Sequence, residues 1–305
     1  MPTMEHLALG LVLLAGTLAT SNPQRRRDLD PVKEVALDMA PSSFDDQYRG
    51  CGRAMEQELE ELNRTEFANN SVYAQAWTLA AAEWRSRRGR VPQPPPLRPE
   101  QAVALLAYTL HSPLHGAFNA AVREAGRSRG RYLGAFAFKA LHFLLSEALR
   151  ALRGARPRCH RVYRGVRGIR FTARRGQAVR FGHFTSASLR NESALPFGRD
   201  TFFSVETCYG VPIRDFSFFP EEDEVLIPPF ESFQVTHVAR DGDRALLQLR
   251  SQDALSTYNC ELVKEKRCRS RPCVFSAGRS IPGDPPRLWG LLLAATALAA
   301  VGGVP

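Results

Sequence analysis

Four consecutive acidic residues, Glu221–Glu224, separate an aromatic run from the apolar segment Val225–Ile227. Two prolines follow and end that segment, because proline has no N–H for a β-ladder. If the strand begins near Glu222, the two-residue period of a strand places Glu222 and Glu224 on one face and turns Asp223 away. Two neighbouring carboxylates repel each other, and this repulsion raises the pKa of one of them. Such an arrangement is more useful for catalysis than for the stability of the fold. Taken alone, the pattern is more typical of a solvated acidic turn.

Two upstream segments are expected to be strands that each carry one polar residue of interest. Cys159–Gly165 contains Arg164 and stops at a glycine, and Phe181–Ser188 contains Ser186. A guanidinium can hold a phosphate with two parallel N–H donors. Each residue alone has an ordinary interpretation, as a surface ion pair, a member of a strand or a turn. Arginine, serine and Glu-x-Glu in this order, each on its own strand, form a combination that those interpretations do not explain together.

This combination resembles the arginine–serine–glutamate signature of ecto-mono-ADP-ribosyltransferases, specifically their arginine-modifying, membrane-anchored vertebrate members. The flanking residues are similar as well, at Val162–Gly165, in the aromatic-Thr-Ser-x-Ser segment at 184–188 and at Glu222–Glu231. The resemblance covers Leu37 to Cys273. It implies the ADP-ribosyltransferase fold and an enzyme that transfers ADP-ribose from its co-substrate NAD to arginine side chains of acceptor proteins, with release of nicotinamide.

The resemblance implies a role for each residue of the signature. Glu224 would stabilise the oxocarbenium-like ribose that forms when its bond to nicotinamide breaks, and would bind a ribose hydroxyl. Arg164 would contact the pyrophosphate, and Gly165 would let the backbone approach the nicotinamide amide. Ser186 would orient Glu224. Glu222 would position the guanidinium of the acceptor, which is protonated at ordinary pH and needs a negative partner.

Three further NAD contacts are implied by the resemblance: Tyr108, Phe181 and Ser217. Asp223 stands where the family has a third glutamate, and we expect this change to be tolerated because the side chain points away from the site. Family members with glutamine at the position of Glu222 are expected to use a different acceptor or mainly to hydrolyse NAD. Two alternatives to arginine transfer remain, namely an NAD glycohydrolase with water as acceptor and a catalytically weak surface recognition protein.

Both ends of the chain indicate a secreted and anchored protein on the extracellular face of the plasma membrane. Residues 1–21 hold a short apolar run and then small residues, which is typical of a cleaved signal peptide, although Glu5 stands where a basic residue is usual. An apolar tail at 288–305 follows a polar spacer at 274–287, the pattern of a GPI anchor signal, with Ser276 as the expected attachment residue. A single tail-anchor helix is the alternative.

The mature chain divides into an N-terminal extension (22–41), a helical portion (42–158) and a β-rich portion that carries the active site (159–273). Helices are predicted at 44–62, 71–88, 99–108 and 134–153, with a proline-rich linker at 91–96. Short β-branched and aromatic runs after Cys159 predict strands, at 162–163, 168–171, 178–181, 202–205, 225–227, 233–238 and 245–249. Helices first and strands second predict an α+β fold, with the helical portion packed on a β-sandwich-like core of short, mostly antiparallel strands. No G-x-G-x-x-G follows a strand, which excludes a Rossmann nucleotide site.

Six cysteines follow the signal peptide, an even number that favours disulfides in a secreted chain. The sequence alone leaves their pairing open. Family resemblance implies Cys51 with Cys260 and Cys159 with Cys208, which leaves Cys268 and Cys273. A zinc site is disfavoured, because the cysteines include no C-x-x-C pair and no histidine accompanies them.

Charge and glycosylation motifs describe the expected surface. The formal net charge is +10, with basic segments at 25–27, 85–90 and 264–271. These are expected loops and ends without a nucleic-acid-binding motif, so anionic lipid headgroups or glycans are better candidates than nucleic acid for contact with this charge. Three sequons fit an extracellular surface, at Asn63, Asn69 and Asn191.

Overall fold

The computed structural model describes residues 31–87, 97–154 and 158–270. The chain divides into two compact units, residues 1–263 and 264–305. Of the second unit the structure describes only the end of helix α8 (Glu261–Ser270). The first unit holds all the other described helices and strands. The predicted signal peptide, the linker at 91–96 and the anchor signal with Ser276 lie outside the described residues. Among the helices of the described ranges, none is both long and apolar enough to cross a bilayer.

The first half of this unit is helical, as predicted. Its helices are α1 (Gly52–Asn69), α2 (Ser71–Arg87), α3 (Pro99–Thr109), α4 (Pro113–Ala125), α5 (Arg129–Ala135) and α6 (Lys139–Arg153). The predicted bounds of α2 and α3 are confirmed to within one residue. Two of the helices, α4 and α5, were not predicted. Each begins at a serine, Ser112 or Ser128, whose hydroxyl accepts a backbone N–H of the first turn and so caps the helix.

The prediction of a helix from Phe44 is wrong at its start, since α1 begins only at Gly52. Residues 43–48 are buried instead, and the ring of Phe44 stacks on Tyr132 with centroids 3.8 Å apart. Tyr48 has a φ of 53°, and its N–H donates to the Asp46 carboxylate over 2.7 Å. Tertiary packing and side-chain hydrogen bonds hold this segment in place, so its apolar residues do not reflect a helical face. The helix predicted from residue 134 likewise starts later, with α6 at residue 139.

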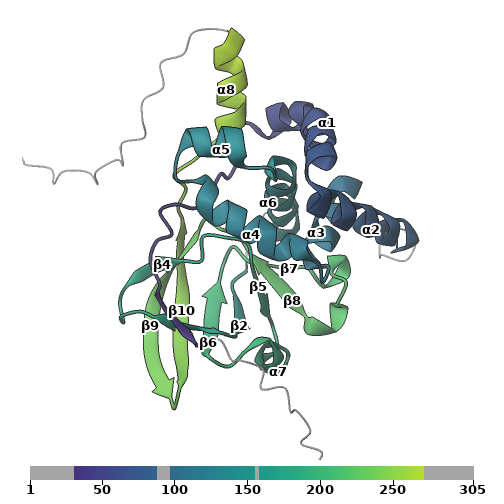
Figure 1. Cartoon of the computed structure of the whole chain (residues 1–305). Coiled ribbons are helices and arrows are strands. Elements are labelled where there is room, and N and C mark those ends of the chain that lie inside the picture. Colours follow the sequence, from purple (N-terminus) through teal and green to yellow (C-terminus); the bar gives the residue numbers. More distant parts are fainter. Residues whose placement is uncertain (1–30, 88–96, 155–157, 271–305) are drawn as a thin grey trace, which may run out of the picture. The chain divides into compact units, whose positions relative to one another are not determined.

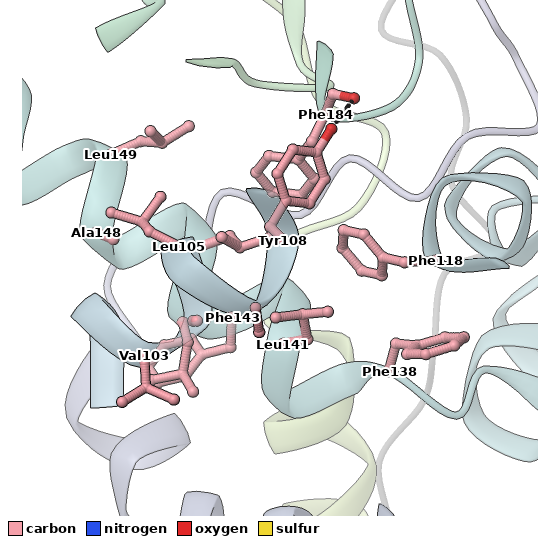
Figure 2. Close-up of a cluster of buried hydrophobic side chains, with 14 of the residues drawn as sticks. Val103, Leu105, Tyr108, Phe118, Phe138, Leu141, Phe143, Ala148, Leu149 and Phe184 are labelled. Carbon is pink, nitrogen blue, oxygen red and sulfur yellow. Dashed lines mark hydrogen bonds between the residues drawn. The ribbon is translucent and has the colours of Figure 1, made fainter. Parts of the chain in front are cut away.

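Helix α3 lies at the centre of the helical core, because all its residues from Gln101 to Thr109 are buried. Figure 2 shows its Leu105 and Tyr108 among the apolar side chains of α6, including Leu141 and Leu149. The Tyr108 hydroxyl donates to the backbone oxygen of Phe184 over 2.7 Å. This bond ties the helical core to the segment that precedes a central strand of the sheet.

The strands follow the helices along the chain, apart from one short strand near the N-terminus. They are β1 (Lys33–Ala36), β2 (His160–Val166), β3 (Ile169–Thr172), β4 (Ala178–Arg180), β5 (Thr185–Ser188), β6 (Thr201–Thr207), β7 (Val211–Pro212), β8 (Glu224–Ile227), β9 (Glu231–Asp241) and β10 (Arg244–Ala254). Eight of them form one sheet in the order β4-β9-β10-β6-β2-β5-β8-β7, and β1 pairs with β3. In Figure 1 the helices α1–α6 gather at one end of this unit and the strands at the other.

The predicted α+β fold is confirmed. Pairing between strands is mostly antiparallel, and the parallel pairs are β1 with β3 and β6 with β10. The small sheet packs on the large one, where the Phe171 ring lies 5.6 Å from that of Phe203. A second apolar cluster fills this region, separate from the helical core, and includes Val162, Val205 and Phe233. The strand order brings β2, β5 and β8 together, and these are the strands that carry the predicted arginine, serine and glutamate.

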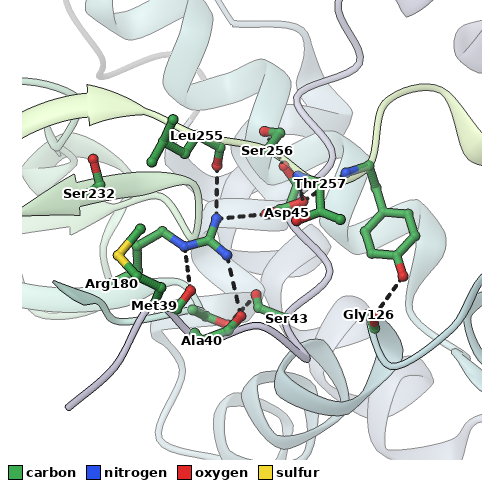
Figure 3. A network of polar contacts seen from close by, with 12 residues as sticks. Met39, Ala40, Ser43, Asp45, Gly126, Arg180, Ser232, Leu255, Ser256 and Thr257 are labelled. Atoms are coloured by element: carbon green, nitrogen blue, oxygen red, sulfur yellow. Dashed lines mark hydrogen bonds and ion pairs between the residues drawn. The ribbon is translucent and has the colours of Figure 1, made fainter. Parts of the chain in front are cut away.

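A buried ion pair connects three distant segments of this unit (Figure 3). The Arg180 guanidinium on β4 donates to the Asp45 carboxylate over 2.6 Å and to the Leu255 backbone oxygen over 2.8 Å. Asp45 also accepts the N–H groups of Thr257 and Tyr258. Both charges are buried and each is satisfied by several hydrogen bonds, which is the condition for a buried pair to be tolerated.

Two disulfides have the pairing that the family resemblance implies. Cys51 joins Cys260 across a sequence separation of 209 residues, and Cys159 joins Cys208 across 49. The first connects the start of α1 with the segment that leads to α8, and the second connects the chain just before β2 with the end of β6. Such long closures restrict the unfolded chain and stabilise a fold by roughly 2–4 kcal/mol each. Cys273 lies outside the described residues.

Candidate active site

A cavity of about 420 Å³ opens where the carboxyl end of α3 meets the strands β2, β5 and β8. Further walls come from the short helices α7 (Asn191–Ala194), η1 (Leu195–Phe197) and η3 (Pro220–Glu222), and from residues 110–115, which lead from α3 into α4. The four residues predicted to be catalytic all line this cavity: Arg164, Ser186, Glu222 and Glu224. Tyr108 and Gly165, two of the predicted NAD contacts, line it too. Sequence positions more than 100 residues apart therefore meet at one site.

Glu224 is the first residue of β8 and is only 6% exposed. Antiparallel pairing of β5 with β8 sets Ser188 opposite Glu224 and Ser186 opposite Leu226. The hydroxyl of Ser217 donates to Oε2 of Glu224 over 3.2 Å. Burial raises the pKa of Glu224, while hydrogen bonds from Ser186 and Ser217 lower it in part. The arrangement holds a carboxylate in a poorly solvated wall with a serine on each of two neighbouring segments.

Glu222 reaches the same cavity by a different route from the one the sequence predicts. The strand begins at Glu224, not near Glu222, and Glu222 ends the short helix η3. Between them Asp223 adopts a left-handed conformation with φ 46°. This turn, rather than the two-residue period of a strand, brings both glutamates to one cavity. Burial raises the pKa of Glu222, and the charge of His111 acts in the opposite direction.

Arg164 lies in the middle of β2 and is half-buried at the cavity wall. Its Nη1 donates to the backbone oxygen of Ser186 over 2.6 Å, which fixes the side chain across the neighbouring strand β5. Burial lowers the pKa of Arg164, and the nearby Glu224 raises it. A guanidinium has so high a pKa that it stays cationic under these influences. The cavity wall therefore carries a fixed positive charge beside a carboxylate.

Gly165 is required by the chain's own packing. A Cβ atom at this position would lie 2.4 Å from the Ala194 oxygen and 2.5 Å from the Gly198 oxygen. The backbone after α7 crosses β2 so closely that only glycine fits. The family resemblance implies that this glycine lets the backbone approach a bound nicotinamide, and the structure supplies a separate reason for glycine that holds without any ligand.

Two predicted NAD contacts lie behind the cavity wall. Ser217 is fully buried and contacts the site through its hydrogen bond to Glu224. Phe181 packs on the rings of Phe203 and Phe233, with centroids 5.6 Å away in both cases, and is absent from the cavity lining. In this structure Phe181 belongs to the apolar cluster of the sheet.

Two residues of α4 that were not predicted from the sequence contribute to the site. His115 lines the cavity, and burial together with the Arg164 and Arg123 charges lowers its pKa to about 4, so the ring is neutral at physiological pH. The Asn119 amide donates to the Tyr108 hydroxyl over 3.1 Å. The sequence signal for both is His111-Ser-Pro-x-His115, a serine cap and a proline at a helix start, which predicts a helix next to α3.

Comparison with known proteins identifies the family. A model described as NAD:arginine ADP-ribosyltransferase matches residues 37–257, which include every residue of the cavity. The chain belongs to the NAD:arginine ADP-ribosyltransferase family. Because the match runs from the segment after β1 to the end of β10, it spans both the helical portion and the sheet.

Relatives of this family from vertebrates match nearly the whole chain. The chain is 58% identical over 278 residues to an erythroblast NAD(P)(+)--arginine ADP-ribosyltransferase of Gallus gallus, with 91% of this chain and 92% of the relative covered. It is 52% identical over 311 residues to the GPI-linked NAD(P)(+)--arginine ADP-ribosyltransferase 1 of Homo sapiens, with 96% and 94% covered. The family resemblance inferred from the sequence is thereby confirmed.

Solved structures of this family share the fold. A crystal structure of the eukaryotic mono-ADP-ribosyltransferase ART2.2 matches with a TM-score of 0.63 and 37% identity, over 74% of this chain and 98% of that chain. A variant of the same protein in complex with NAD matches with a TM-score of 0.64 and 36% identity, over the same shares of the two chains. The family fold is therefore present over most of the described residues.

The three predicted glycosylation sites differ in their surroundings. Asn69 and Asn191 are exposed, at the end of α1 and the start of α7. Asn63 is half-buried on α1, and its Oδ1 accepts the Tyr73 hydroxyl over 2.6 Å. In the part of the chain that the structure describes, no group of three metal-ligating side chains comes together.

Proposed function

We propose that this chain transfers ADP-ribose from NAD to arginine side chains of proteins, with NAD as co-substrate and nicotinamide as product. The observation that carries the proposal is the meeting of two glutamates, Glu222 and Glu224, with Arg164 and Ser186 in one cavity. Membership of the family and the names of the relatives support it.

The first half of the reaction breaks the bond between ribose and nicotinamide. Nicotinamide leaves with the bonding electron pair, and positive charge develops on the ribose. The Glu224 carboxylate is buried and held by serines, so it can oppose that charge without reorganising. Ser186 and Ser217 keep part of its charge satisfied through hydrogen bonds. We assign Glu224 to the reacting sugar, with Ser186 as the residue that orients it.

Arg164 is assigned to the pyrophosphate of NAD. Its Nη1 donates to the Ser186 backbone oxygen, and this hydrogen bond fixes the plane of the guanidinium against β5. A fixed planar cation matches the oxygens of a phosphate. Tyr108 would contribute its ring to the same wall, because its hydroxyl is already bonded to Phe184 and Asn119. Phe181 and Ser217 would act on NAD only indirectly, through the residues that lie between them and the cavity.

The second half of the reaction forms a bond from a guanidinium nitrogen to the same ribose carbon. The nitrogen must lose a proton as it attacks, and the Glu222 carboxylate is the group placed to attract the guanidinium and accept that proton. A raised pKa makes Glu222 a better proton acceptor than an exposed glutamate. Hydrolysis of NAD is the competing reaction, because water can take the place of the guanidinium. The presence of Glu222 favours arginine over water as the acceptor of ADP-ribose.

The test is an assay with labelled NAD and agmatine, a small guanidinium compound, run with the full mature chain. The proposal predicts label on agmatine in excess of free ADP-ribose. Release of free ADP-ribose without labelled agmatine would identify an NAD glycohydrolase, and no consumption of NAD would favour a surface recognition protein.

The cell surface is the place where this activity is expected, in keeping with GPI-linked and ecto-enzyme relatives. We propose removal of residues 1–21 and attachment of a GPI anchor to the carboxyl group of Ser276, which breaks the bond to residue 277 and releases residues 277–305, the apolar tail 288–305 included. The proposed acceptors are extracellular or cell-surface proteins. Phosphatidylinositol-specific phospholipase C should then shed the protein from cells. Retention on treated cells would favour a membrane-spanning tail.

A further inference from the structure

Asp223, between the two proposed reacting glutamates, occupies an unusual backbone conformation. Its φ of 46° and ψ of 50° lie in the left-handed region, which aspartate tolerates better than most residues. The Asp223 oxygen accepts the N–H of Leu189 over 3.1 Å. The conformation reverses the chain between η3 and β8, so the direction in which Glu222 points depends on this one residue.

The side chain of Asp223 turns away from the cavity and bridges two arginines. Its Oδ2 lies 3.0 Å from Nε of Arg190, and its Oδ1 lies 3.2 Å from Nη1 of Arg214. Arg190 follows β5, and Arg214 begins the short helix η2 (Arg214–Phe216). One carboxylate therefore joins the turn to a segment on each side of it.

The backbone of the same turn is bonded to the end of β5. The guanidinium of Arg190 also donates to the Glu221 oxygen. The hydroxyl of Ser188 donates to the Glu222 oxygen over 2.6 Å and accepts the Arg190 N–H over 2.9 Å. Together with the Asp223 oxygen, three successive carbonyl groups of the turn are held by β5 and the residues that follow it.

We propose that Asp223, clamped by Arg190 and Arg214, is a positioning residue that aims the Glu222 carboxylate at the acceptor guanidinium. This inference rests on the proposed function and concerns the acceptor half of that site. Glu224 does not depend on the clamp in the same way, because strand pairing with β5 and the Ser217 hydroxyl hold it.

The clamp contributes little to folding. The side chains of Arg190 and Arg214 are 51% and 63% exposed, and exposed ion pairs add little to stability because water screens them. Small displacements of a reacting group, by contrast, lower reaction rates strongly. Removal of the clamp should therefore appear in the kinetics of arginine transfer and hardly in the melting temperature.

The test compares Asp223→Ala with the unaltered mature chain, using labelled NAD and agmatine. We expect kcat/KM for transfer to fall about tenfold, consistent with a misplaced Glu222, while NAD hydrolysis changes by less than about twofold. Asp215→Ala is the matched control, since Asp215 is an exposed acid on η2 that makes no ion pair with the described residues. In a Glu222→Ala background the effect of Asp223→Ala on transfer should disappear, because the group being positioned is absent.

A second variant, Asp223→Asn, separates the effect of the side-chain charge from the effect of the backbone conformation. Asn also tolerates the left-handed conformation but cannot form the two ion pairs, so Asp223→Asn should lose transfer as Asp223→Ala does. Full transfer by Asp223→Asn would overturn the clamp, as would equal losses of transfer and hydrolysis in Asp223→Ala. Absence of agmatine transfer by the unaltered chain would instead overturn the proposed function, and the clamp's role with it.

Discussion

Glu224 and Glu231 are two buried carboxylates of the same short segment with different surroundings. Glu231 accepts hydrogen bonds from two hydroxyls, those of Thr207 at 2.5 Å and Ser251 at 2.6 Å. It also accepts two backbone N–H groups, those of Cys208 at 2.8 Å and Tyr209 at 3.2 Å. Glu224 accepts the Ser217 hydroxyl over 3.2 Å and faces a cavity that Ser186 also lines.

The difference shows how burial can serve structure in one place and chemistry in another. Burial raises the pKa of both groups, and hydrogen bonds lower it in part. The acceptor sites of Glu231 are filled by protein donors, so this carboxylate connects β6, β9 and β10. Glu224 retains acceptor capacity on the side of the cavity, where a ribose hydroxyl or a developing positive charge can use it.

The largest expected effect is the loss of activity in Glu224→Gln. Loss of the charge should reduce both arginine transfer and NAD hydrolysis by about a thousandfold or more, corresponding to about 4 kcal/mol in the barrier. Because the pKa of Glu224 is raised in the folded state, its ionisation disfavours folding above its ordinary pKa. At neutral pH the variant should melt at the same temperature or higher. A large drop in melting temperature would show that Glu224 is a structural carboxylate like Glu231.

Glu231→Gln should have the opposite effects, namely a loss of stability and an unchanged rate of NAD consumption. Its amide cannot accept all four hydrogen bonds of Glu231, so at least one buried donor loses its partner at a cost of roughly 1–3 kcal/mol. Urea denaturation would measure this loss, with Glu206→Gln on β6 as the control. Folded Glu231→Gln should retain its rate of NAD consumption. A selective loss of rate without loss of stability would place Glu231 in the reaction.

The smallest effect concerns Glu66, a third buried carboxylate, which accepts the N–H groups of Lys139 at 2.6 Å and Ala140 at 3.0 Å at the start of α6. Burial raises its pKa to about 6. Since the raised value favours the protonated form in the folded state, its contribution to stability is complete below the ordinary pKa and is lost as pH rises through 6. The free energy of unfolding should fall by about 2 kcal/mol between pH 4 and 7 from this group. Glu66→Gln should lack that part of the pH dependence, and an identical pH profile in both proteins would refute the assignment.

Much of the candidate site could be predicted because its residues stand in short local motifs that resemble those of a known family. Arg164, Ser186 and the two glutamates each belong to a short strand-like motif, and the strand order that brings β2, β5 and β8 together gathers them in one cavity. The α+β class followed from the change of periodicity after residue 159. These features depend on nearby residues, which a sequence displays directly.

The features of the site that could not be predicted depend on contacts between segments that are distant in the sequence. The need for glycine at position 165 comes from the backbone at Ala194 and Gly198, and the place of Phe181 comes from its packing on Phe203 and Phe233. The start of β8 at Glu224 depends on the left-handed turn at Asp223, which two arginines stabilise. Apart from Asp223 and Glu224, these partners are not adjacent in the sequence to the residues they affect, so periodicity could not reveal them.

The most direct test of the division of labour between the two glutamates is parallel kinetics of Glu222→Ala and Glu224→Gln with NAD, in the presence and absence of agmatine. If Glu224 acts on the NAD bond and Glu222 on the acceptor, Glu224→Gln loses both reactions. Glu222→Ala then loses transfer to agmatine and retains appreciable NAD hydrolysis, because Arg164, Ser186 and Glu224 remain. Equal losses of both reactions in Glu222→Ala would contradict this division and indicate one interchangeable acidic patch.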